Sequence, residues 1–375
     1  MHRHLVVAWL ALAATLGLTL SGCTPPEQTG ATALVIGNRQ NMPRPALLQT
    51  AADALSKAIK RGDRLVVIAV SGEPQIVAKS DLRCPYDNKP SCAKYTKDKL
   101  AAIPGVVAKY PATATESSLL AAINLARDNI ANTTGPKQII TIDSGIDTVA
   151  PMPLTDLSVL AADQPTIAKG LANNGFSPNL SGISVLMTGL GQTMSPQPKL
   201  TSPEIARLQT LWTAVLDAAH VDNVEIDPAA LPQGTRDATL PRVTPAKQPP
   251  PPETEDPCKE FSFNESDLGF EPDRATFRDH ARAKAALSGI ARVLVKTGLN
   301  VVLTGTTAYR ETNPDNPLSN ARATAAKNIL VELGVPAKRI LTQGVGIAWH
   351  GYRDPGHNPV DEIKMRLVLV RPTCP

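Results

Sequence analysis

The stretch LSNARATAAKNILVELGVPAKRILTQGVG, residues 318–346, decides the fold of the C-terminal part of this 375-residue chain. Residues 318–333 read as a helix, and Gly334 is a typical residue at a helix end. Residues 339–345 then form a short strand pattern. Just upstream, NVVLT at 300–304 is a further strand that ends at Gly305. This stretch therefore predicts a strand–helix–strand unit.

The flanking segments extend that unit into a domain of residues 258–375. Phe261 and Phe263 indicate a first strand, and residues 277–295 carry an apolar stripe at helical spacing. Residues 364–370 give a closing strand. The predicted order is βαβαββ, an α+β domain.

These residues resemble the OmpA-like domain, a module that binds peptidoglycan without a covalent bond. The resemblance rests on VVLTG at 301–305, LSNARA at 318–323 and LVELGVPAKRILTQGVG at 330–346, in the family's order. It implies an α+β fold and a site for the diaminopimelate end of a peptide stem. In the family a loop Asp of G-H-T-D binds the ammonium group, and the Arg of L-S-x-x-R-A binds the carboxylate.

Only half of that pair is present in this chain. Arg322 falls on the family arginine, and Arg366 loosely matches an arginine of the last strand. The candidate ligand-binding residues are Gly305, Thr306, Thr307, Ala308 and Arg322. Thr306 stands at the His position and Ala308 at the Asp position, so the place of the family's carboxylate has no charge. The resemblance therefore predicts weakened or altered wall binding.

Two interpretations of Arg322 stay open. It is either the carboxylate anchor, a role that suits its planar guanidinium, or a helix-surface arginine paired with Asp315 or Glu311.

Residues 32–227 alternate strand and helix patterns. Strands are predicted at 33–36, 64–70, 138–142 and 183–188, with a hairpin partner at 72–78, and helices at 45–60, 117–129 and 203–219. This alternation predicts an α/β domain with a parallel sheet covered on both faces.

Two segments of this domain resemble the von Willebrand factor A fold: ATATESSLLAAINLA, which contains Thr115, and QIITIDSGIDT, which contains Asp143. That family holds a divalent ion with a D-x-S-x-S motif after its first strand. Here residues 37–41 read GNRQN, without the Asp or either Ser, and Arg39 brings positive charge. Hard cations need several oxygen ligands, so we expect no metal site. Thr115 is instead expected to cap a helix, and Asp143 to start a turn.

The N-terminus reads as a leader. Residues 5–20 are almost wholly apolar, too short to span a bilayer comfortably but the right length for a signal-peptide core. LSGC at 20–23 resembles the bacterial lipobox. We expect a signal peptide at 1–22, lipid on Cys23 and a tether at 23–31, which would place the protein outside the cytoplasm on a membrane. The alternative is an uncleaved anchor helix.

The other four cysteines suit an oxidising compartment. Of three possible pairings, Cys84–Cys92 is favoured as a local clip and Cys258–Cys374 as a closure of the last domain. Zinc is the rival, but no CxxC spacing supports it.

Residues 228–257 contain nine prolines, including the run 249–252, and predict a semi-rigid linker. The net charge of +4 comes without a basic run, so nucleic acid is not an expected partner. No catalytic motif or cofactor signature is present, and an enzyme is not expected. The sequence thus predicts a lipid-anchored envelope protein that links membrane to wall. The alternative is a scaffold whose OmpA-like domain has lost wall binding and contacts protein partners, as the first domain also would.

Overall fold

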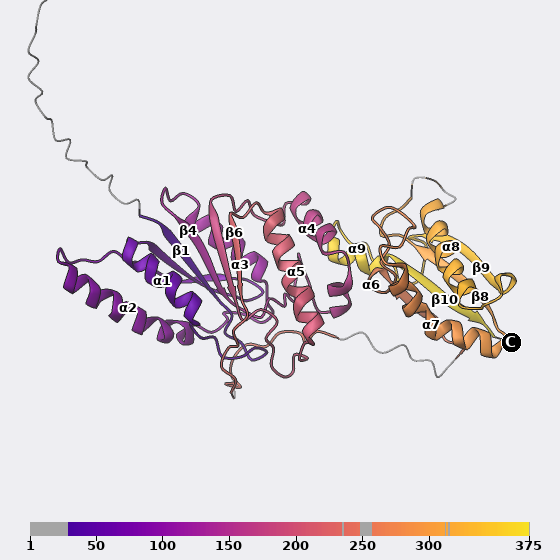
Figure 1. Cartoon of the computed structure of the whole chain (residues 1–375), viewed down its shortest axis with the longest axis horizontal. Helices are drawn as coiled ribbons and strands as arrows, with labels where there is room; N and C mark the ends of the chain where they lie inside the picture. Colours follow the sequence, from indigo (N-terminus) through magenta and orange to yellow (C-terminus); the bar gives the residue numbers. More distant parts are fainter. Residues whose placement is uncertain (1–28, 235, 248–256, 312, 314–315, 375) are drawn as a thin grey trace, which may run out of the picture.

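The computed structural model describes residues 29–234, 236–247, 257–311, 313 and 316–374. They form two sheets, each with its own helices, that lie next to one another along the long axis of the molecule (Figure 1). Cys23 and the proline run 249–252 lie outside the described residues, and so does Asp315.

The first sheet has six strands in the order β3-β2-β1-β4-β5-β6. Its strands are β1 (Ala31–Ile36), β2 (Arg64–Ala69), β3 (Gln75–Asp81), β4 (Lys137–Ile142), β5 (Ile183–Thr188) and β6 (Asn223–Asp227). All neighbours are parallel except β3, which returns antiparallel to β2 as the hairpin prediction required. The predicted α/β class with a mostly parallel sheet is confirmed.

Helices cover both faces of this sheet because its buried strands present apolar side chains alternately to each face. On one face Leu34 and Ile36 pack with α1 (Gln49–Arg61) and α2 (Lys89–Lys109). On the other, Ala33 and Val35 pack with three helices. These are α3 (Leu119–Ile130), α4 (Gln164–Asn173) and α5 (Ser202–Ala218), joined by the 3₁₀ turn η1 (Leu157–Ala161).

The second sheet has four strands in the order β7-β10-β8-β9. Its elements are β7 (Phe261–Asn264), α6 (Glu265–Leu268), α7 (His280–Thr297), β8 (Asn300–Thr306), α8 (Pro317–Glu332), η2 (Ala337–Arg339), β9 (Ile340–Gly346), α9 (Pro359–Met365) and β10 (Leu367–Thr373). β10 is antiparallel to β7 and β8, and β8 is parallel to β9. The predicted βαβαββ order is present with two short helices, α6 and α9, added to it.

Two local predictions were wrong. The helix after Thr115 begins at Leu119, and Ser118 caps it by accepting a hydrogen bond from the amide of Ala121. The closing strand starts at Leu367, because the preceding residues from Pro359 form α9. In the first domain, helices α2 and α4 and strand β6 were not predicted.

The first part of the proline-rich segment is not a free spacer. Residues 228–247 lie along the first domain, where Leu231, Val243 and Ala246 are buried. Arg236 donates to the side chain of Asn38 at 2.6 Å, and the amide of Gln40 donates to the carbonyl of Pro241 at 3.1 Å. Prolines keep their carbonyls and apolar rings, so a proline-rich chain can still pack when a domain supplies the donors.

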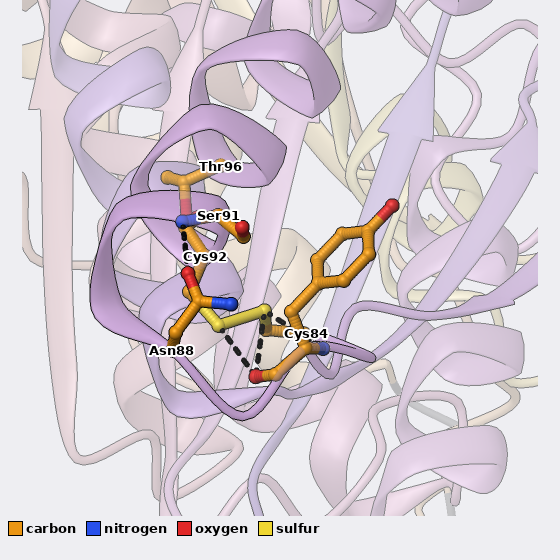
Figure 2. Close-up of a disulfide and its surroundings, with 6 residues drawn as sticks. Cys84, Asn88, Ser91, Cys92 and Thr96 are labelled. Atoms are coloured by element: carbon orange, nitrogen blue, oxygen red, sulfur yellow. Dashed lines mark hydrogen bonds between the residues drawn. A yellow bond between two sulfur atoms is a disulfide. The ribbon is translucent and has the colours of Figure 1, made fainter.

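The four cysteines form the two predicted disulfides, Cys84–Cys92 and Cys258–Cys374, which excludes the zinc alternative for them. Figure 2 shows the first bridge beside Asn88, whose side chain caps α2 by accepting from the amide of Ser91 at 2.9 Å. In the part of the chain that is described, none of the helices is both long and apolar enough to cross a membrane.

Candidate ligand-binding site around Arg322

The loop after β8 is fixed by backbone packing. A Cβ at Gly305 would lie 1.9 Å from the carbonyl oxygen of Ser319, so only glycine lets β8 approach α8 this closely. The Thr306 hydroxyl donates to the carbonyl of Met365 at 2.7 Å, and the Thr307 amide donates to the carbonyl of Gly346 at 3.1 Å. Both threonines are buried. These residues therefore hold the loop in place.

Ala308 ends this buried stretch and is 4% exposed. Its carbonyl accepts a hydrogen bond from the Tyr352 hydroxyl at 3.2 Å. The position where the family has its loop carboxylate thus carries no charge and is partly covered by Tyr352.

Arg322 projects from α8 and is only 3% exposed. Its Nε donates to the carbonyl of Arg274 at 3.1 Å, and its guanidinium lies 5.3 Å from the centre of the Phe270 ring. Neither Nη atom has a hydrogen bond to a described residue. The plane of the guanidinium is thus fixed by contacts within the domain.

The interpretation of Arg322 as a surface arginine is wrong, because burial removes it from the helix surface. Glu311, one of the two suggested partners, instead accepts hydrogen bonds from the amides of Leu318 at 2.8 Å and Ser319 at 3.1 Å. Glu311 thereby satisfies two backbone amides in the first turn of α8, where amides without a helical partner attract an anion. The other suggested partner, Asp315, lies outside the described residues.

A charged network lies next to Arg322. Glu265 is buried between Arg278, at 3.3 Å, and Arg366, at 3.1 Å. Arg366 also pairs with Glu362 at 2.8 Å. Burial, followed by the charge of Arg366, lowers the pKa of Arg322, while Glu265 acts in the opposite direction. Arginine nevertheless stays charged at neutral pH.

Tyr309 connects the loop to this network. Its hydroxyl contacts Glu362 Oε1 at 2.5 Å, and burial and that carboxylate raise the pKa of Tyr309. We call Ala308, Tyr309, Arg322, Glu362 and Arg366 the Arg322 site.

Of the Arg322 site, the sequence singled out Ala308, Arg322 and Arg366. Tyr309 was missed because the family motif that was compared ends at Ala308. Glu362 was missed because its segment, DEIKMR at 361–366, reads as the start of a strand. The acidic pair that opens this segment would have been a signal for the first turn of a helix.

Asp143, one of the two residues that suggested a von Willebrand A site, is buried at the carboxyl end of the first sheet, whereas Thr115, the other, is exposed. Arg39 Nη1 lies 2.6 Å from Asp143 Oδ2, and Arg39 also donates to the hydroxyl of Ser144 at 3.0 Å. Asp143 further accepts from the amide of Gly145 at 2.8 Å, the turn role expected of it. No cluster of three or more metal-ligating side chains occurs in the described ranges. A guanidinium thus occupies the place next to Asp143 where a cation would bind.

Comparison with known proteins identifies the second domain. Residues 269–354 match the OmpA family, so the C-terminal domain is an OmpA-like domain. The chain before residue 269 lies outside this match. No curated protein is similar in sequence to this chain.

Several solved structures are similar to the second domain. The OmpA-like domain of FopA1 from Francisella tularensis subsp. tularensis SCHU S4 is 19% identical, with a TM-score of 0.23, over 30% of this chain and 73% of that chain. The cell wall anchor of the T6SS from Pseudomonas aeruginosa is 21% identical, with a TM-score of 0.27, over 31% and 81%. The peptidoglycan-associated lipoprotein from Burkholderia pseudomallei is 20% identical, with a TM-score of 0.25, over 32% and 98%.

Proposed function

We propose that this protein is a lipid-anchored component of the bacterial cell envelope that links a membrane to peptidoglycan. Cys23 would carry the lipid, and the OmpA-like domain would bind the wall without a covalent bond. Its task is attachment rather than catalysis. We also propose that the first domain is a von Willebrand A-like module without a metal, which is presented to a protein partner.

The observation that supports wall binding best is the state of Arg322. Its guanidinium is oriented by Phe270 and by the carbonyl of Arg274, yet its terminal nitrogens have no hydrogen bond to a described residue. A fixed guanidinium with a free fork suits a carboxylate, which it can bind through two parallel hydrogen bonds. The terminal carboxylate of a peptide stem is such a ligand.

The alternative is a domain that has lost wall binding and contacts another protein. Ala308 favours this alternative, because it is buried and offers no charge to an ammonium group, and its carbonyl already accepts a hydrogen bond from Tyr352. Loss of one charge-assisted hydrogen bond weakens binding by about 1.5–3 kcal/mol, which is about ten- to hundredfold in affinity.

Sedimentation of the full chain with purified peptidoglycan tests the proposal. The wild-type chain should co-sediment, and Arg322→Ala should lower binding at least about tenfold. Arg322→Lys should restore little of it, because an ammonium cannot make the two parallel bonds. Arg292→Ala, at an exposed position of α7, is the matched control. A wild-type chain that stays in solution, or binding that ignores Arg322→Ala, favours the protein-partner alternative.

A further inference from the structure

Helix α9 belongs to the second domain by sequence but to the first by packing. Val360 and Ile363 are 0% and 2% exposed, and both join the hydrophobic cluster of the first domain rather than that of the OmpA-like domain. Figure 1 shows α9 next to α4. Burial of aliphatic side chains stabilises the contact that buries them, so the first domain orders α9.

Polar contacts fix the same junction. Asn358 caps α9 by accepting from the amide of Val360 at 3.0 Å, and its Nδ2 donates across the junction to the carbonyl of Pro151 at 2.9 Å. Asn174 of α4 donates to the carbonyl of His357 at 3.1 Å. Two asparagines, one from each domain, thus join the start of α9 to the first domain.

The opposite side of α9 faces the Arg322 site. Glu362 contacts the hydroxyl of Tyr309 with one carboxylate oxygen and Arg366 with the other. Its side chain is 16% exposed, so solvent and ligands can reach it. The loop that lacks a carboxylate at Ala308 therefore receives one from α9 at the next residue.

We propose that Glu362 supplies the acidic half of the Arg322 site, and that the first domain holds it there, so that the two domains together bind the zwitterionic end of a peptide stem. This inference rests on the proposed function, since it concerns the same ligand.

The chemistry of the site supports this assignment. An amino-acid end carries an ammonium and a carboxylate, and it needs a fixed anion and a fixed cation. A carboxylate has about four lone-pair positions, and Tyr309 and Arg366 use two of those of Glu362. Arg366 bridges Glu362 and Glu265, and Arg278 donates both to Glu265 and to the carbonyl of Phe270. The ring of Phe270 lies against the guanidinium of Arg322. A chain of direct contacts thus connects Glu362 to Arg322, while the packing of α9 reduces the ordering that ligand binding requires.

The first test uses the full chain and two muropeptides, one with the free side-chain amine of diaminopimelate and one with that amine acetylated. Wild type should prefer the free amine by about tenfold or more. Glu362→Gln should lower the affinity for the free-amine muropeptide by about the same factor and abolish the preference for it over the acetylated one. The double variant Ala308→Asp, Glu362→Gln should regain part of the affinity and part of the preference for the free amine. Glu332→Gln, an exposed glutamate of α8, is the matched control.

The second test disturbs the packing of α9 on the first domain. A Cβ at Gly170 of α4 would lie 2.8 Å from Cβ of Pro359, so Gly170→Leu must displace the start of α9. Affinity for the free-amine muropeptide should fall several-fold. Gly105→Leu is the control, because a Cβ at this helical glycine meets no atom within 4 Å. Asn174→Ala removes one junction hydrogen bond without adding bulk and should weaken binding in the same direction, by less.

The outcomes separate the two proposals. If Arg322→Ala leaves binding unchanged, or wild type binds neither muropeptide, the proposed function fails and this inference with it. If Arg322→Ala weakens binding but Glu362→Gln keeps the affinity and the amine preference, the assignment of Glu362 alone is overturned. If Glu362→Gln behaves as expected while Gly170→Leu and Asn174→Ala bind like wild type, the role of the first domain is overturned.

Discussion

Arg39 and Asp143 form a bidentate ion pair inside the first domain, with Nη1 at 2.6 Å from Oδ2 and Nη2 at 3.1 Å from Oδ1. The exposed fractions of the two side chains are 2% and 0%. The pair joins the loop after β1 to the end of β4, two neighbouring strands. The carboxyl edge of the sheet, where α/β domains commonly bind ligands, is here occupied by the guanidinium of Arg39.

Breaking this pair should unfold the first domain at a much lower urea concentration. Arg39→Met leaves Asp143 buried without its partner, which typically costs about 3–5 kcal/mol. Urea unfolding of a chain that begins at residue 23, followed by the fluorescence of Trp212 in a Trp349→Phe background, measures it. Lys94→Met, which breaks the exposed Lys94–Asp98 pair, should cost less than about 1 kcal/mol. Equal losses in the two variants would contradict a structural role for the buried pair.

Divalent ions should leave the first domain unaffected. Arg39 already provides positive charge next to Asp143, and a second cation would be repelled. Calorimetric titration of the full chain with magnesium or calcium should detect no tight site, and neither ion should raise the melting temperature. A low-micromolar site that disappears in Asp143→Asn would refute this expectation.

The stability of the first domain should fall between about pH 5 and pH 8. Complete burial raises the pKa of Asp147 to about 8, although it accepts hydrogen bonds from the amides of Leu119 and Leu120. The folded state thus holds a proton that the unfolded state releases near pH 4, so stability is highest below that pH. It is lost as the pH rises through 8, by at most about 1.4 kcal/mol per unit.

Urea titrations across this range, on wild type and Asp147→Asn, measure the effect. Asp147→Asn should remove most of the slope. A flat wild-type profile would mean that the helix amides keep the carboxylate ionised.

Cys23→Ala should prevent lipidation, because no other thiol follows the apolar leader at the expected distance. The variant should accumulate as an uncleaved precursor without lipid, which the mass of the intact protein and labelling with radioactive palmitate both measure. Cys84→Ser, which keeps the leader intact, serves as the control. A mature, lipid-modified Cys23→Ala protein would rule out the lipobox assignment.

The sequence predicted those parts of the fold in which local pattern and packing agree. Short apolar runs such as residues 138–142 identify buried strands, and the helix of the LSNARA segment follows from its spacing and from Gly334. Helix α2 escaped prediction because Pro104 lies inside it and few of its side chains are buried. Residues 228–247 were read from their prolines alone, whereas their position depends on donors such as Arg236 and on partners far away in sequence.

The site could be predicted only where it repeats a motif. Arg322 was found in this way, and Ala308 was recognised as a missing charge. Glu362 lies 54 positions beyond Ala308, and what brings it to the loop is the packing of Val360 and Ile363 on another domain. No local pattern reports such a contact.

The Cys258–Cys374 bridge determines how the OmpA-like domain bears mechanical load. The chain enters this domain at residue 258, next to β7, which is an edge strand, and β10 lies inside the sheet between β7 and β8. A pull that arrives through residue 258 passes across the covalent bridge directly to the end of β10. Peeling β7 away one hydrogen bond at a time is thereby prevented. Tension must instead act on β10, which is hydrogen-bonded to a neighbouring strand on each side.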